Sequence, residues 1–235
     1  MKFDYLSLVT AAHYHKSEFV LIEEKLRDGF IINKALLDVG FGQGKYLDLA
    51  KSIGYRTFGV EVNHNYIELS KNNGHECFHI SELEKIDTRF DVILMSHIIE
   101  HLQHSEIISI IEKYINLLCD NGILIIASPV LGERFYYDIT HIRPYYPQSI
   151  WHAFGNNNEE LSISRSGVKI KLKDIHYIKD SYRIRNTRSY YIRDGLSFSY
   201  YTIKVLNYLL ALIYLMSCRR IGIKASWIGI YMKEN

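Results

Sequence analysis

Apolar and polar positions follow two alternating periods between residues 17 and 131. In "SEFVLIEEKLRDG", Phe19, Ile22 and Leu26 recur at helical spacing behind Ser17, a good N-cap residue, so this segment is predicted to be a helix. The short apolar run "ALLDV" is typical of a buried strand, as are "TFGVEV", "ECFHI", "FDVILMS" and "ILIIAS". Nearly continuous apolar strands separated by helices indicate a parallel sheet that helices cover on both faces.

The helices between these strands are predicted from their caps and apolar stripes. One runs from Tyr46 to Ile53, another covers "NYIELSKNNG", and the longest begins behind Ser105 and carries an isoleucine-rich stripe. After the fifth strand, Pro147 favours the start of a helix over 148–154. The pattern is therefore that of an α/β protein.

Three alternating glycines follow the first predicted strand in "LLDVGFGQG". Gly40, Gly42 and Gly44 lie at the carboxyl end of a parallel strand, where open α/β sheets bind ligands and glycine lets the backbone come close to them. The dinucleotide fingerprint GxGxxG would need a glycine where Lys45 stands, which argues against NAD. Glu61, at the end of the second strand, is placed to accept hydrogen bonds from both hydroxyls of a ribose.

The segments "LLDVGFGQG", "GVEV", "FDVILMSHIIEHL" and "GILIIASP" occur in the order of the motifs of class I S-adenosylmethionine-dependent methyltransferases, and residues 35–131 resemble that family. The resemblance implies a Rossmann-like, doubly wound, mostly parallel sheet with an antiparallel last strand, and S-adenosylmethionine as the cofactor. It also implies the residues that bind each part of the cofactor. The methionine end would be held by Asp38, Gly40, Gly42 and Gly44, and the ribose by Glu61. The adenine would lie against Ile80 and Ser81, and the sulfonium near Ser96 and His97.

The resemblance also organises the end of the chain. The segments "VKIKLKDIHYI" and "WIGIYMK" would be the sixth and seventh strands. We therefore expect one methyltransferase domain over residues 1–235, with its core at about 17–178 and 225–235 and a helical insertion over 180–224. A chain of 235 residues with 48% hydrophobic content suits a single core.

The segment "SHIIEHLQH" is rich in groups that can move protons. On a helix, His97, Glu100, His101 and His104 would share one face, and His101 is our candidate proton acceptor. The same letters match HxxEH, so a zinc hydrolase is one alternative. The segment follows a parallel strand and closes soon afterwards, which favours the methyltransferase. A sulfonium methyl is already electrophilic, so we expect no metal.

The segment "DITHIRPYYPQSI" resembles a D-x-T-H-x-R stretch of methyltransferases that act on glycans and related small molecules. This resemblance makes His141 a candidate general base, and makes Asp138 and Arg143 candidates for binding the acceptor. A structural alternative is that Asp138 caps a turn and pairs with Arg143. The two interpretations are compatible.

Positive charge is concentrated in one part of the chain. Residues 162–224 carry thirteen Lys or Arg against three Asp, which leaves −8 for the rest of a chain whose net charge is +2. Inside this part, "YYTIKVLNYLLALIYLMSC" has its longest uninterrupted apolar run from Tyr208 to Met216, too short to span a membrane. It suits peripheral contact with an anionic membrane, or packing on the core or on a second copy in a homodimer. We expect no nucleic-acid partner.

The remaining patterns bear on location and function. Three scattered cysteines and an N-terminus without a secretory pattern indicate the cytoplasm, with peripheral contact at the inner membrane face as the extension of that prediction. We expect methyl transfer to an oxygen or nitrogen of a small polar acceptor, first of all a sugar of a surface polysaccharide or lipid-linked glycan. The alternative from another class is an inactive cofactor-binding scaffold that acts through residues 180–224.

Overall fold

A computed structural model describes residues 18–28, 34–155, 167–184 and 198–234. Ser17, the expected N-cap of the first helix, lies outside these ranges, and residues 18–28 are helical with Ile22 and Leu26 fully buried. The later elements, in chain order, are β1 (Ala35–Val39), α2 (Lys45–Ile53), β2 (Arg56–Glu61), α3 (His64–Asn72), β3 (Glu76–His79), the 3-10 helix η1 (Ile80–Lys85), β4 (Phe90–Ser96), the 3-10 helix η2 (Ile99–His101), α4 (Ile107–Leu117), β5 (Leu118–Pro129), the 3-10 helix η3 (Glu133–Tyr137), α5 (Pro147–Phe154), β6 (Ile170–Asp180), α7 (Phe198–Met216) and β7 (Ile223–Lys233).

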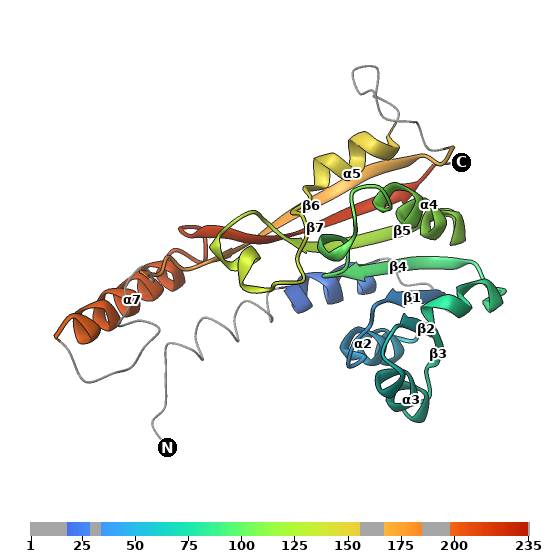
Figure 1. The fold of residues 1–235 in the computed structure, drawn as a ribbon, viewed down its shortest axis with the longest axis horizontal. Coiled ribbons are helices and arrows are strands. Elements are labelled where there is room, and N and C mark those ends of the chain that lie inside the picture. Colours follow the sequence, from blue (N-terminus) through green and yellow to red (C-terminus); the bar gives the residue numbers. More distant parts are fainter. Residues whose placement is uncertain (1–17, 29–33, 156–166, 185–197, 235) are drawn as a thin grey trace. The chain divides into compact units, whose positions relative to one another are not determined.

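Seven strands form one sheet in the order β3-β2-β1-β4-β5-β7-β6 (Figure 1). The strands from β3 to β5 pair in parallel, whereas β7 runs antiparallel to β5. The order reverses at β1, from which the chain winds first toward β3 and then toward β5. The expected doubly wound sheet with an antiparallel last strand is confirmed, as is a helix, α7, in the segment before that strand.

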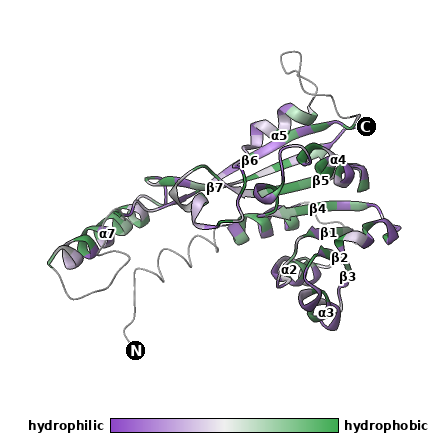
Figure 2. Cartoon of the chain, viewed as in Figure 1, coloured by the Kyte–Doolittle hydropathy of each residue, from purple (hydrophilic) through white to green (hydrophobic). Residues whose placement is uncertain are grey.

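The sheet is the core of the fold. All five residues of β1 are buried, and β4 and β5 carry mostly apolar residues (Figure 2). The Phe41 side chain, from the glycine loop, packs over Gly59 of β2. A Cβ at Gly59 would lie 2.5 Å from the Phe41 ring, closer than packed atoms approach, so only glycine leaves room for this contact. The phenylalanine thereby holds the loop against the sheet.

The longest helix of the first half begins later than predicted. Ser105 is not the N-cap of α4, because the helix begins at Ile107 behind Glu106, which makes no side-chain cap hydrogen bond. The N–H groups of Glu106 and Ile107 both donate to the carbonyl oxygen of Gln103. Ser105 is thus part of the turn that precedes the helix, and backbone hydrogen bonds replace the expected side-chain cap.

The chain divides into two compact units, one of residues 1–21 and 177–225 and the other of residues 22–176 and 226–235. In the first unit, the Asn207 side chain of α7 exchanges hydrogen bonds with both backbone groups of Ile184, and the Tyr214 hydroxyl donates to the Lys179 carbonyl oxygen at 2.6 Å. No helix among the described residues combines the length and the apolar character needed to cross a membrane.

Candidate cofactor and acceptor site

The three alternating glycines form a tight loop between β1 and α2. Gly40, Gly42 and Gly44 have φ values of 66°, 55° and 80°, in the left-handed region that favours glycine, and Gly44 is the N-cap residue of α2. The Gly40 N–H donates to the Val60 carbonyl oxygen at 2.7 Å, and the Gly44 N–H donates to the Phe41 carbonyl oxygen at 2.9 Å. The loop is therefore fastened to the end of β2 and closed on itself.

The space on the two sides of this loop differs. A Cβ at Gly40 would lie 2.1 Å from Cδ1 of Ile98, so this glycine lets the segment after β4 come against the loop. Among the residues that the structure describes, a Cβ at Gly42 would meet no heavy atom of a non-neighbouring residue within 4 Å. The outer side of the loop at Gly42 is thus open to a ligand.

Glu61 ends β2 and holds two backbone turns with one side chain. Its Oε2 accepts a hydrogen bond from the Gly42 N–H at 3.0 Å, and its Oε1 accepts from the N–H groups of Val62 and Asn63 at 2.8 and 3.0 Å. The residue is 9% exposed, and each carboxylate oxygen has lone pairs beyond those that the loop uses. It can therefore accept hydroxyl hydrogen bonds as well as shape the glycine loop.

Asp38, the next-to-last residue of β1, is a buried carboxyl with an unused oxygen. It is 1% exposed, and its Oδ2 has no hydrogen-bond partner in the part of the chain that the structure describes. Burial raises the pKa of Asp38 from 3.8 to about 8; the positive charge of Lys45 works against this rise and the negative charge of Glu61 adds to it. A buried polar atom without a partner beside an open loop fits a ligand that brings a donor or a positive charge.

The expected adenine and sulfonium residues lie at the same edge of the sheet. Ile80 and Ser81 begin η1, where the His79 side chain accepts a hydrogen bond from the Ser81 N–H, and Ile80 is 42% exposed. Ser96 ends β4, and His97 follows it with φ 59°, its N–H donating to Ala127 of β5 at 2.8 Å. A bulky residue rarely adopts that conformation, so His97 is a strained position at the carboxyl edge of β4.

The helical face expected for "SHIIEHLQH" does not form. The helix η2 is a three-residue 3-10 turn that ends before Leu102, so His97 and His104 both lie outside it, and His104 is exposed. Glu100 of η2 is fully buried. Its Oε1 lies 3.1 Å from His97 Nδ1, and its Oε2 accepts a hydrogen bond from the Ser128 hydroxyl at 3.1 Å.

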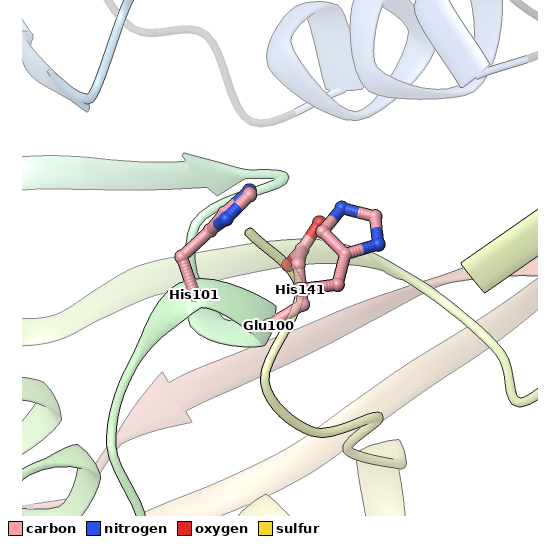
Figure 3. A group of neighbouring side chains, drawn as sticks. All are labelled: Glu100, His101 and His141. Carbon is pink, nitrogen blue, oxygen red and sulfur yellow. The ribbon is translucent and has the colours of Figure 1, made fainter. Parts of the chain in front are cut away.

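Two histidines from distant parts of the sequence meet beside Glu100 (Figure 3). The rings of His101 and His141 lie 4.8 Å apart between centroids. The loop that carries His141 is fastened to η2, because the Ile142 N–H donates to the Glu100 carbonyl oxygen at 2.8 Å. The structure thus brings together the two candidate proton acceptors predicted from separate motifs.

Asp138 and Arg143 are placed differently from each other. Asp138 caps a turn, since its Oδ1 accepts hydrogen bonds from the Thr140 N–H at 2.9 Å and hydroxyl at 2.6 Å, which lower the pKa of Asp138. Its Oδ2 lies 3.8 Å from His141 Nε2. Within residues 34–155 the Asp138 carboxylate thus lies next to His141 and does not pair, as the structural alternative expected, with Arg143, whose side chain is exposed.

Three residues that contact His97, His101 or Asp138, namely Glu100, Thr140 and Ser128 through Glu100, were not among the predicted site residues. Glu100 and Thr140 stand inside the two motifs that drew attention to their histidines, so spacing alone could have nominated them. Ser128 ends an apolar strand and carries no local signal. Its role became visible only when β5 placed it beside η2.

A family model described as a methyltransferase domain matches residues 22–181. The chain belongs to this methyltransferase domain family. Similar solved structures include an S-adenosylmethionine-dependent methyltransferase from Archaeoglobus fulgidus, with 22% identity, a TM-score of 0.57 and coverage of 91% of this chain and 93% of that one. No curated protein sequence matches the chain.

Two further methyltransferases share the fold. Magnesium protoporphyrin IX methyltransferase from Synechocystis, solved with bound S-adenosylmethionine, has 11% identity and a TM-score of 0.57, with coverage of 100% of this chain and 86% of that one. The N-methyltransferase NodS from Bradyrhizobium japonicum has 10% identity and a TM-score of 0.56, with coverage of 94% and 97%. The protein is an S-adenosylmethionine-dependent methyltransferase, and the open loop at Gly42 and the unpartnered Asp38 oxygen fit that cofactor.

The raised pKa of Asp38 predicts a pH-dependent stability of the ligand-free methyltransferase. From pH 4 toward pH 8 the folded protein keeps a proton that the unfolded chain has lost, so unfolding releases a proton and stability falls as pH rises. The fall attributable to this group is at most ~1.4 kcal/mol per pH unit. Asp38→Asn should remove it.

Urea unfolding at about pH 5.5, 6.5 and 7.5 measures this effect as the difference in the free energy of unfolding between wild type and Asp38→Asn. The contributions of the other titratable groups cancel in that difference. Asp87→Asn, at an exposed position, is the matched control, and its free energy of unfolding should differ from that of wild type by an amount that does not change with pH. A pH-independent difference for Asp38→Asn would show that its carboxyl is already ionised in the folded protein.

Proposed function

We propose that this methyltransferase transfers a methyl group to a hydroxyl oxygen, or an amine nitrogen, of a small polar acceptor, with His101 as the proton acceptor and His141 beside it. The observation that carries the proposal is the pair of imidazoles held 4.8 Å apart beside η2, close after the carboxyl end of β4. Acceptor chemistry is expected at this edge because it is also the edge of the cofactor loop.

The hydrogen bonds of the two rings fix where their lone pairs lie. His101 Nδ1 is 3.2 Å from the Thr140 carbonyl oxygen and 3.1 Å from the Thr140 hydroxyl, which already donates its hydrogen to Asp138. His141 Nδ1 is 2.7 Å from the Phe135 carbonyl oxygen. Because these partners only accept, Nδ1 of each ring carries a hydrogen, and in the neutral ring Nε2 has the lone pair.

That tautomer suits removal of a proton from the acceptor. When bound at the glycine loop, the cofactor would supply an electrophilic methyl carbon, with its sulfur as the leaving group that keeps the bonding electrons when the acceptor oxygen attacks. His101 Nε2 takes the hydroxyl proton and then releases it to water. His141 holds the acceptor beside it, and the turn at Asp138 and Thr140 fixes the orientation of His101.

A sugar hydroxyl of a surface polysaccharide or lipid-linked glycan is our first candidate acceptor. Support comes from the D-x-T-H-x-R segment, whose Asp138, Thr140 and His141 the structure gathers around His101. The exposed Arg143 side chain, two residues after His141, is available for an anionic group such as the phosphate of a glycan carrier.

On the cofactor side, we assign the methionine end to Asp38 and the glycine loop, and the ribose hydroxyls to Glu61. Ile80 and Ser81 lie beside the end of β2, since Glu61 pairs with His79 of β3, and they would face the adenine. Ser96 and His97 would approach the sulfonium. These roles are supported by one shared edge of the sheet and by the open side of Gly42.

Removing the Glu61 carboxylate should weaken cofactor binding. Glu61→Ala would lose two hydroxyl hydrogen bonds and release the Gly42 N–H, so the Kd for S-adenosylhomocysteine should rise by at least ~30-fold, about 2 kcal/mol. Calorimetric titration measures the change, with the exposed Glu68→Ala on α3 as control. An unchanged Kd for Glu61→Ala would show that Glu61 does not bind the ribose.

Removing the proton acceptor should slow methyl transfer without weakening cofactor binding. His101→Ala should lower kcat by about 10²-fold or more, with the Kd for S-adenosylhomocysteine within about two-fold of wild type. The exposed His104→Ala is the control. Radiolabelled methyl transfer to nucleotide sugars, glycan intermediates and small amines measures the effect. If none of them accepts a methyl group, the acceptor class is wrong while the cofactor assignment stands.

We further propose that α7 rests on an anionic membrane surface. Its buried side carries Asn207, Ala211 and Tyr214, one or two helical turns apart, whereas eight large apolar side chains on the helix are exposed: Phe198, Tyr201, Val205, Leu206, Tyr208, Leu209, Ile213 and Met216. An exposed apolar surface of this kind marks an interaction site. The positive charge that the sequence concentrates in residues 162–224 favours anionic lipid as the partner.

Vesicle binding tests this contact. Cosedimentation with vesicles containing roughly 30% anionic lipid should exceed that with neutral vesicles, and should fall with added salt. Leu209→Asp with Ile213→Asp should abolish it, while Ser109→Asp on α4 should behave like wild type. Equal binding to both kinds of vesicle, or none, would assign the apolar surface of α7 to a protein partner.

Neither alternative function gains support. A scaffold without activity would not need the two oriented imidazoles. A zinc hydrolase of the HxxEH kind requires His97 and His101 one turn apart on a helix, and His97 lies before η2 with a left-handed backbone.

A further inference from the structure

We propose that Glu100, His101 and His141 form a binding site for a first-row divalent transition-metal ion. One ligand atom from each of the three residues lies within 4.8 Å of the other two. In the view of Figure 3, the Glu100 carboxylate lies between the two rings. This inference departs from the expectation of a metal-free site drawn from the sequence.

The three groups are almost close enough to share one ion. Nitrogen and oxygen ligands lie about 2.0–2.2 Å from zinc, so two ligands in a tetrahedral site are roughly 3.3 Å apart. The largest separation of 4.8 Å exceeds that value by roughly 1.5 Å, which side-chain rotations would have to close when an ion binds. The two segments are already joined through the backbone, because the Ile142 N–H donates to the carbonyl oxygen of Glu100.

Each ligand has the outer hydrogen bond that metal ligands typically have. The Nδ1–H groups of His101 and His141 donate to the Thr140 and Phe135 carbonyl oxygens, which leaves the Nε2 lone pair of each ring available to a ligand. The Glu100 carboxylate is held by Ser128 and lies beside His97. Such partners fix the tautomer and raise the basicity of the ligands.

The charge of the cluster also favours a cation. Glu100 is fully buried, and a second carboxylate oxygen, Asp138 Oδ2, lies 3.8 Å from His141 Nε2. A neutral His141 would turn its lone pair toward that carboxylate. A bound ion between these groups replaces this repulsion with attraction.

The donor set selects the class of ion. Two imidazoles and one carboxylate suit Zn²⁺, Co²⁺, Fe²⁺ or Mn²⁺, whereas Mg²⁺ and Ca²⁺ prefer oxygen ligands. With three protein ligands, a further position remains for water or for the acceptor. His101 and His141 are partly exposed, so the ion and the acceptor can reach the site.

The consequence for catalysis rests on the proposed function. An acceptor hydroxyl bound to the ion would have a lowered pKa and lose its proton to water, so that the ion takes over the role of His101 Nε2 in the metal-free site. Binding of the ion itself does not depend on the acceptor, and the two ideas can therefore be tested separately.

Titration of the chelator-treated full chain with Co²⁺, followed by visible absorption and calorimetry, tests the site. Wild type should bind about one ion per chain, and His101→Ala, His141→Ala and Glu100→Gln should each weaken binding by at least ~100-fold, more than the loss of an outer-shell partner. His104 is an exposed histidine of the same segment, and the His104→Ala variant should bind Co²⁺ as tightly as wild type does. A wild type that does not bind Co²⁺ saturably, or any of the three variants that binds as tightly as wild type, would overturn the assignment.

A measurement on wild type guards against variants that do not fold. Zn²⁺ should protect His101 and His141, and not His104, from acylation of the imidazole by diethylpyrocarbonate, as read by peptide mass spectrometry. Equal modification with and without Zn²⁺ would refute the site. Binding of S-adenosylhomocysteine and methyl transfer in the presence of chelator report on the proposed function: transfer without Co²⁺ binding rejects only the metal, and Co²⁺ binding without transfer to any acceptor rejects only the acceptor chemistry.

Discussion

The parallel register of β1, β2 and β4 is the constraint on which the site depends. Val39 lies opposite Val60 in β2 and Met95 in β4, so the residues that follow all three strands emerge at one edge of the sheet. At that edge the left-handed glycine backbone bends the chain back toward β2, and the Gly42 N–H meets the carboxylate of Glu61. A shift of one residue in this register would turn each of these groups to the other face.

The proposed acceptor side lies at the same edge of the sheet and is built from other elements. A three-residue 3-10 turn replaces the helix that commonly follows a strand, and the loop after β5 returns to it through a backbone hydrogen bond to Glu100. That loop is also held from its far end, where Trp227 and Tyr231 of β7 donate to the carbonyl oxygens of Tyr145 and Pro147. The antiparallel last strand therefore helps to fix the loop that carries His141.

Two energetically unfavourable features of the fold lie at this edge of the sheet. His97 has a left-handed backbone, and Asp38 is buried with an oxygen that has no partner among the described residues. Strain and unsatisfied polar groups persist where the surrounding structure enforces them, and they are common at functional sites. Both fall next to the proposed places of the cofactor, which is consistent with a site that is complete only when its ligand is bound.

The sequence by itself determined the succession of strands and helices along the chain, the position of the glycine loop and the acidic end of β2, because these follow from local periodicity and from glycines that only a tight turn requires. It could not determine the start of α4, where backbone hydrogen bonds to Gln103 outweighed the capping preference of Ser105. Nor could it show that "SHIIEHLQH" forms only one 3-10 turn, since these residues are compatible with an α-helix as well as with a short turn. The pairing of His101 with His141, forty residues away, and the burial of Glu100 against Ser128 were decided by the tertiary structure alone, because they depend on where β5 and β7 place the loop between them.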